Sequence, residues 1–105
     1  MDSKNKKGVD KMWIIHEENH DCLCVAERLG EGINWLIKND WLDGNTVGID
    51  KEDNEYQIKD IVKGSDENKY CIFSYLTQLC AKDGVEAVLE WLERFGFYFG
   101  EIEVA

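Results

Sequence analysis

The sequence of 105 residues contains no proline, and it has no apolar run close to the ~20 residues of a membrane-spanning helix. Without proline, no rigid linker marks a domain boundary, and the length suits one domain. The polar start MDSKNKKGVDK leads only into the short apolar block MWII, which does not make a signal peptide. We therefore expect a cytoplasmic protein with one domain over residues 12–105, preceded by a flexible basic leader over residues 1–11.

Basic residues are few: 12 Lys and Arg stand against 22 Asp and Glu, which gives a formal net charge of −10. The leader holds four lysines and two aspartates, a sum of +2, so the remaining chain carries −12. Nucleic-acid binding depends on neutralising phosphates, so this acidic body predicts no direct nucleic-acid binding. A basic protein is the partner that such a surface attracts. The alternative is that the charge only keeps a small domain soluble.

Motifs of catalysis are also missing. None of the three serines stands in a nucleophile elbow, and the glycines do not cluster as a phosphate-binding loop. A Cys–His nucleophile pair needs a thiol of lowered pKa, whereas the acidic neighbours Glu17, Glu18 and Asp21 would raise it. We expect a protein that is not an enzyme and that holds no cofactor.

Both histidines and two of the four cysteines lie in WIIHEENHDCLCV, residues 13–25. His16, His20, Cys22 and Cys24 are the ligand types that zinc prefers, which makes a small metal-binding protein one alternative. However, a single residue between two cysteines on a strand holds their sulfurs roughly 6–7 Å apart, too far for one tetrahedral site. We expect no metal here, and reduced thiols rather than disulfides in a chain without an export signal.

The same stretch predicts a β-hairpin, because the β-prone runs MWIIHE and CLCVAE flank the turn residues ENHD. A turn centred on Asn19 and His20 pairs Glu17 with Cys22, Ile15 with Cys24 and Trp13 with Ala26. One face of the hairpin then carries Trp13, Ile15, Cys22, Cys24 and Ala26. The other carries Met12, Ile14, His16, Leu23 and Val25.

Apolar residues at helical spacing predict three helices and one shorter helical piece in IKDIV, residues 58–62. The first stripe is Ile33, Leu36, Ile37 and Trp41, which we expect Asp43-Gly44 to end. The second is Ile72, Leu76, Leu79 and Cys80, ended by Asp83-Gly84. The third is Val85, Val88, Leu89, Leu92 and Phe95, with Glu86, Glu90 and Glu93 on the opposite side. Between the helices, the charged run 50–55 is expected to be an exposed loop.

FYFGEIEV predicts a closing strand. A bulge at Gly100 would place Phe97, Phe99, Ile102 and Val104 on one face. The fold class is therefore α+β: a small antiparallel sheet of about three strands, made of the N-terminal hairpin and the C-terminal strand, with three to four helices packed on one face. The opposite face of the sheet is left uncovered, and an uncovered apolar face usually marks an interface.

Four tryptophans are many for a chain of this length. Trp35 and Trp91 fall beside the main stripes of their helices, so they are expected to be exposed and to act as anchors of an interaction surface. The acidic part of that surface is expected to comprise Asp50, Glu52, Asp53, Glu55, Glu86, Glu90 and Glu93. The alternative is that the tryptophans fill the core.

Two stretches resemble known proteins. The opening MWIIHEENHDCLCVA and the ending FYFGEIEV, with a hairpin followed by a helix, resemble small, acidic, mostly uncharacterised α+β proteins of bacterial phages and mobile elements. The resemblance does not extend to residues 43–70, and it assigns no role to any residue. It implies an accessory protein that modulates or inhibits a host process.

Together these features predict a non-enzymatic, acidic protein-binding module that inhibits or regulates a basic, nucleic-acid-binding host protein. One variant of this hypothesis is mimicry of nucleic acid, in which carboxylates occupy a phosphate-binding groove. A homo-oligomeric accessory protein, including a homodimer, is the second hypothesis, and it involves the uncovered face of the sheet rather than the charge.

Overall fold

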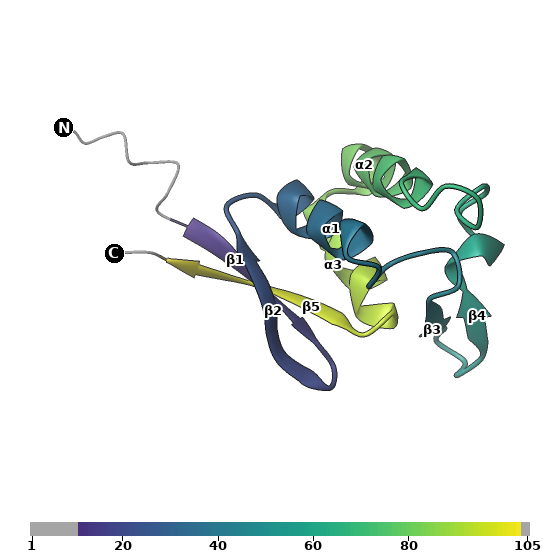
Figure 1. Ribbon diagram of the computed structural model, residues 1–105, viewed down its shortest axis with the longest axis horizontal. Coiled ribbons are helices and arrows are strands. Elements are labelled where there is room, and N and C mark those ends of the chain that lie inside the picture. The colour runs from purple at the N-terminus through teal and green to yellow at the C-terminus, as the bar shows by residue number, and fades with distance from the viewer. Residues whose placement is uncertain (1–10, 104–105) are drawn as a thin grey trace.

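The computed structural model describes residues 11–103, which form an α+β fold (Figure 1). In chain order the elements are β1 (Lys11–Glu17), β2 (His20–Ala26), α1 (Leu29–Lys38), β3 (Val47–Ile49), β4 (Glu55–Gln57), the 3₁₀ turn η2 (Ile58–Asp60), α2 (Cys71–Asp83), α3 (Val85–Arg94) and β5 (Phe97–Glu103). The fold class is the one expected from the sequence. Of the leader expected over residues 1–11, Lys11 opens β1 and the rest lies outside the described residues.

The main sheet has β1 at its centre, paired antiparallel with β2 on one side and with β5 on the other. Figure 1 shows that the described ends of the chain, at the start of β1 and the end of β5, lie side by side. The closing strand therefore pairs with the hairpin, as the sequence predicts. β2 and β5 are the two edges of the sheet.

The hairpin register is confirmed only in part. Trp13 faces Ala26 and Ile15 faces Cys24, but Glu17 faces His20 instead of Cys22, because β2 bulges between these pairs. As a result Cys22 is exposed, and Leu23 packs against the core, the reverse of the expected faces. The cause is a turn one residue earlier than expected.

Glu17 holds this turn. Its Oε1 accepts the backbone N–H of Asn19 at 2.9 Å and lies 2.6 Å from Nδ1 of His20. The ring of His20 packs edge-to-face on Trp41, with 5.3 Å between the ring centroids. These contacts favour a turn over residues 18–19, which sequence spacing alone does not reveal.

β5 runs without the expected bulge. Its register against β1 is continuous, from Lys11 opposite Glu103 to Glu17 opposite Phe97. The uninterrupted ladder satisfies more backbone hydrogen-bonding groups than a bulge would. Ile102 therefore shares a face with Met12 and not with Phe97, and Val104 lies outside the described residues.

Helix α1 buries Ile33, Leu36 and Ile37 as expected, but it ends at Lys38, well before Asp43-Gly44. Asp40 takes a left-handed conformation, with φ of 65°. The N–H group of Asp40 then donates a hydrogen bond to the carbonyl of Ile37, and that of Trp41 donates one to the carbonyl of Leu36. These two hydrogen bonds together form a Schellman motif. Trp41 therefore lies beyond the helix, half-buried against the core.

Helices α2 and α3 follow their predicted stripes in part, since Leu79, Cys80 and Leu89 are only half-buried. Gly84, with φ of 90°, separates them as expected. In α2 the buried residues are Ile72 and Leu76, and in α3 they include Val88 and Leu92, followed by Phe95. The predicted burial of Val85 is wrong, because this residue begins α3 at the edge of the core and remains 42% exposed.

Residues 43–70 contain a second hairpin that the sequence did not reveal. β3 and β4 are three residues each and pair antiparallel, with Gly48 opposite Tyr56. The expected exposed loop is correct for residues 51–54, whereas Asp50 is half-buried and Glu55 opens β4. The helical piece expected in IKDIV is the single turn η2, which buries Ile58.

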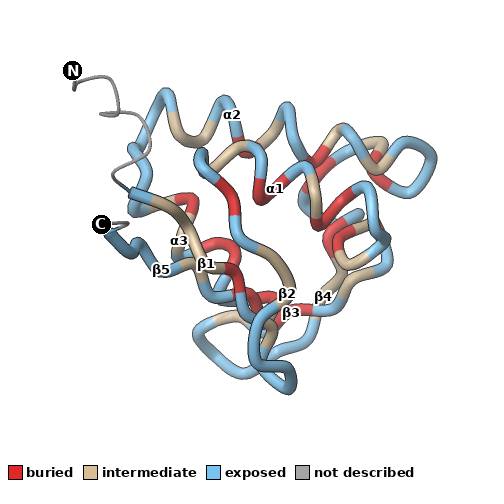
Figure 2. The backbone as a smooth tube through the Cα atoms, turned by 60° about the vertical axis from the view of Figure 1, so that its left-hand side comes forward, coloured by how far each residue is buried: buried red, intermediate tan, exposed pale blue. Residues whose placement is uncertain are grey.

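The core lies between one face of the main sheet and the helices. α1 packs on β1 and β2 and α3 packs on β5, while α2 lies across α1 and α3. Gly32 brings α1 close to the sheet, since a Cβ there would lie 2.9 Å from Ile15. Figure 2 shows that the buried residues, coloured red, lie where these elements meet, and that exposed residues follow the outer loops. Over residues 11–103, no helix has the length and apolarity to cross a membrane.

Candidate functional site

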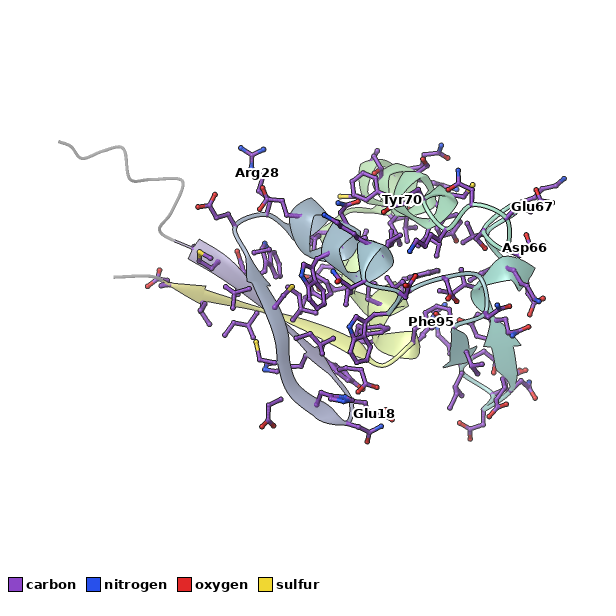
Figure 3. All side chains as sticks on the ribbon, viewed as in Figure 1. Glu18, Arg28, Asp66, Glu67, Tyr70 and Phe95 are labelled. Atoms are coloured by element: carbon purple, nitrogen blue, oxygen red, sulfur yellow. The ribbon has the colours of Figure 1, made fainter. Side chains whose placement is uncertain are left out.

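The β3–β4 hairpin docks on the end of α3 through aromatic contacts. The rings of Tyr56 and Phe95 meet edge-to-face, with 5.4 Å between centroids. Gly48 lies so close that an added Cβ would be 2.5 Å from the ring of Phe95. Figure 3 shows Phe95 at this junction, between the end of α3 and β3. The hairpin and the helix, about forty residues apart along the chain, are therefore fixed neighbours.

This docking brings the β3–β4 hairpin beside the end of α3, and these two segments hold the acidic residues that the sequence singled out. We call them the acidic surface: Asp50, Glu52, Asp53, Glu55, Glu86, Glu90 and Glu93. Each is exposed except Asp50, which is half-buried. Asp50 and Glu52 line one hollow with Arg94, and Glu90 stands one helical turn before Arg94 on α3. With Lys51 and Arg94, the seven carboxylates of the two segments sum to a formal charge of −5.

Asp50 is fixed by its own loop. Its Oδ1 accepts the N–H groups of Glu52 at 2.8 Å and Asn54 at 2.9 Å, and Asp53 completes the loop with φ of 67°. The bond from Asn54, then that from Glu52, lowers the pKa of Asp50, and the charge of Arg94 adds to this. Asp50 is therefore an ionised group held in a defined position.

Trp35 and Trp91, both expected to be exposed anchors, differ in how far they are buried. Trp91 is only 4% exposed, so the expectation of an exposed side chain is wrong for it. The centroid of its ring lies 4.6 Å from that of Phe95 and 5.8 Å from that of Tyr75. Trp91 is buried because α2 and the β3–β4 hairpin pack beside α3 and cover more of its surface than the helical stripe alone predicts. Its Nε1 has no hydrogen-bond acceptor among the described residues. Trp35 is half-buried and packs against the core.

A recess beside the acidic surface went unnoticed in the sequence. It is lined by Asp50, Tyr56, Ile61, Tyr75, Trp91 and Arg94, and it has a volume of about 320 Å³. These residues come from the β3–β4 loop, β4, the segment after η2, α2 and α3. No local pattern links five such separate segments, so only the folded chain defines this site.

The His16, His20, Cys22 and Cys24 group does not converge. His20 is exposed, and while its ring packs on Trp41 it also lines an open hollow with His16, Cys22 and Tyr98; Cys24 does not line that hollow. Within residues 11–103, no three His, Cys, Asp or Glu side chains are grouped as metal ligands would be. All four cysteines are free thiols. Burial, and after it the nearby Cys22, raises the pKa of Cys24.

The uncovered face of the main sheet is apolar and continuous. We call it the open face; its strand positions hold Met12, Ile14, His16, Val25, Tyr98, Gly100 and Ile102. Met12 stands opposite Ile102, and Ile14 stands between Val25 and Gly100. Val25, Tyr98 and Ile102 are 40–49% exposed, and none of these positions carries an acidic side chain.

A second apolar surface is the groove between the three helices. Leu29, Gly30 and Ile33 of α1 form one side, and Phe73 of α2 and Val85 of α3 stand partly exposed among its other lining residues. The sequence predicts the stripes of the three helices but not the gap between them, which depends on their packing angles.

No known protein family, curated protein or solved structure matches this chain.

Proposed function

We propose that this protein is a non-enzymatic protein-binding module whose acidic surface engages a basic partner. The observation that supports it is the docking of the β3–β4 hairpin on α3, which combines two separate acidic segments. Carboxylates held on a rigid hairpin and helix attract a basic partner during encounter and set its orientation in the complex. No chemistry beyond binding is required of these side chains.

The partner's class follows from the charge. Nucleic-acid-binding proteins carry clustered Lys and Arg that neutralise phosphates, and a surface of carboxylates competes for the same side chains. We propose that the module inhibits or regulates such a host protein by occupying its phosphate-binding groove. The partner recovered by co-purification should lose affinity for nucleic acid when the module is added. Simultaneous binding of the module and nucleic acid would contradict this proposal.

Paired variants test the acidic surface itself. Glu90→Gln with Glu93→Gln removes two charges from it, and Glu101→Gln with Glu103→Gln removes two exposed charges from β5 instead. The first pair should weaken the complex with the co-purified partner strongly, because short-range charge pairs are lost. The second pair should change it little. Equal weakening by both pairs would mean that only the overall net charge attracts the partner.

A second candidate function is that of a homo-oligomeric accessory protein, and the open face favours it. An apolar patch without acidic positions lets two copies of a chain of net charge −10 meet without opposing carboxylates. Sedimentation at low and high salt separates the candidates. A dimer at micromolar concentration that tightens with salt supports self-assembly, and a monomer in both conditions supports the binding module.

A further inference from the structure

We propose that the recess lined by Asp50, Tyr56, Ile61, Tyr75, Trp91 and Arg94 takes a lysine or arginine side chain of the basic partner. This inference rests on the proposed function and names the anchor of that interaction. Pockets for whole small-molecule ligands span roughly 300–1,000 Å³. At about 320 Å³, this recess is at the lower end, which suits one inserted side chain.

The walls of the recess fit the two parts of a basic side chain. Tyr56 and Tyr75 are half-buried, so each keeps some accessible surface, and contacts with Phe95 and Trp91 fix their rings. Aromatic rings attract an ammonium or guanidinium group through their quadrupole. Ile61, 41% exposed, offers apolar surface for the methylene stem of the same side chain.

Asp50 supplies the opposite charge. Both loop N–H groups bind its Oδ1, and the Asn54 side chain also stabilises the ionised carboxylate, whose two oxygens offer more acceptor sites than these bonds use. The carboxylate therefore retains capacity to accept a bond from a cationic donor. Because the loop already holds the carboxylate, little side-chain entropy is lost when it pairs.

Arg94 bears on whether the recess binds a cationic or an anionic group. It lines the same recess, and it forms no ion pair within the described part of the chain. Alone it would favour an anion, but Asp50 lines the recess, Glu52 lines the adjoining hollow, and the acidic surface with Lys51 and Arg94 sums to a formal charge of −5. A cationic side chain is therefore the occupant that the field favours, and Arg94 weakens its binding by repulsion. Removing Arg94 consequently has opposite effects on cationic and anionic ligands.

The test uses hexalysine as the probe and NMR of the ¹⁵N-labelled full chain. The indole N–H signal of Trp91, assigned by Trp91→Phe, reports on the recess, and backbone amides report on the acidic surface. Tyr75→Leu should weaken hexalysine binding roughly threefold to tenfold, since the π system is lost, and should abolish the Trp91 shift. Tyr75→Phe keeps the ring and should bind as the parent does.

Arg94→Gln, an exposed position that leaves the core intact, should tighten hexalysine binding. Weaker binding by Arg94→Gln, or parent-like affinity in a folded Tyr75→Leu, would overturn the recess as the anchor. If Glu90→Gln with Glu93→Gln still weakens the probe in that case, the acidic surface remains the binding site. If hexalysine moves no signal even at low salt, both the anchor and the proposed function are wrong.

Discussion

Individual carboxylates determine several local conformations in this chain. Glu17 sets the turn of the first hairpin, and Asp50 organises the loop of the second. Asp40 ends α1 in a left-handed conformation and pairs with Lys69 at 2.6 Å. The bonds of Glu17 and Asp50 to nearby backbone N–H groups compete with regular secondary structure, so they shift boundaries by a residue or more. The acidic composition is therefore structural as well as electrostatic.

Asp50→Ala should lower the stability of the protein at neutral pH, because two loop N–H groups lose their acceptor. Asp50→Asn keeps an acceptor oxygen and should lose less. The pKa of Asp50 is lowered in the folded state, so its stabilisation is full above the ordinary aspartate range and is lost as the pH falls through the lowered pKa. Urea unfolding at neutral and acidic pH should show a smaller acid loss for Asp50→Asn than for the parent. An identical loss would contradict this role.

Leu92 tests the core stripe of α3. Its side chain is fully buried, so Leu92→Ala should reduce the free energy of unfolding by about 2–5 kcal/mol through lost burial and a cavity. Glu90→Ala, on the exposed side, should cost less than about 1 kcal/mol. Chemical denaturation of the two variants measures the difference. Similar losses would show that the two sides of α3 are wrongly assigned.

Elements with long, regular periodicity are the ones that the sequence predicts well. The stripes of α1, α2 and α3 and the central register of the first hairpin follow directly from residue spacing. The sequence does not reveal the β3–β4 hairpin, because strands of three residues carry too few alternations to recognise. The helical pattern does not predict the burial of Trp91, because the segments packed beside it, α2 and this hairpin, come from elsewhere in the chain.

Two strand glycines give a matched test of how the β3–β4 hairpin docks. Gly48→Ala would bring a Cβ to 2.5 Å from Phe95 and 3.0 Å from the carbonyl oxygen of Arg94. Such overpacking should cost about 1–3 kcal/mol of unfolding free energy. At Gly100 nothing lies within 4 Å of the added Cβ, so Gly100→Ala should be close to neutral. Equal costs in urea unfolding would mean that the hairpin does not pack closely on α3.

At the scale of the whole molecule, charge and apolar exposure are separated. The acidic surface gathers at the β3–β4 hairpin and α3, whereas the open face gathers across the main sheet. The sequence predicts both the acidic residues and the open face, since it contains the acidic runs and the pattern of a sheet covered on one side. It does not show that the two acidic segments meet, because that depends on the docking of Gly48 and Tyr56 on Phe95.

The salt dependence of the partner complex tests the central claim most directly. The affinity of the parent protein for its co-purified basic partner should fall steeply from low to high ionic strength, because exposed charge pairs are screened. Glu90→Gln with Glu93→Gln should make that fall clearly shallower, while Glu101→Gln with Glu103→Gln should leave its slope close to that of the parent. An affinity that is independent of salt, or a slope unchanged by the first pair of substitutions, would contradict binding through the acidic surface.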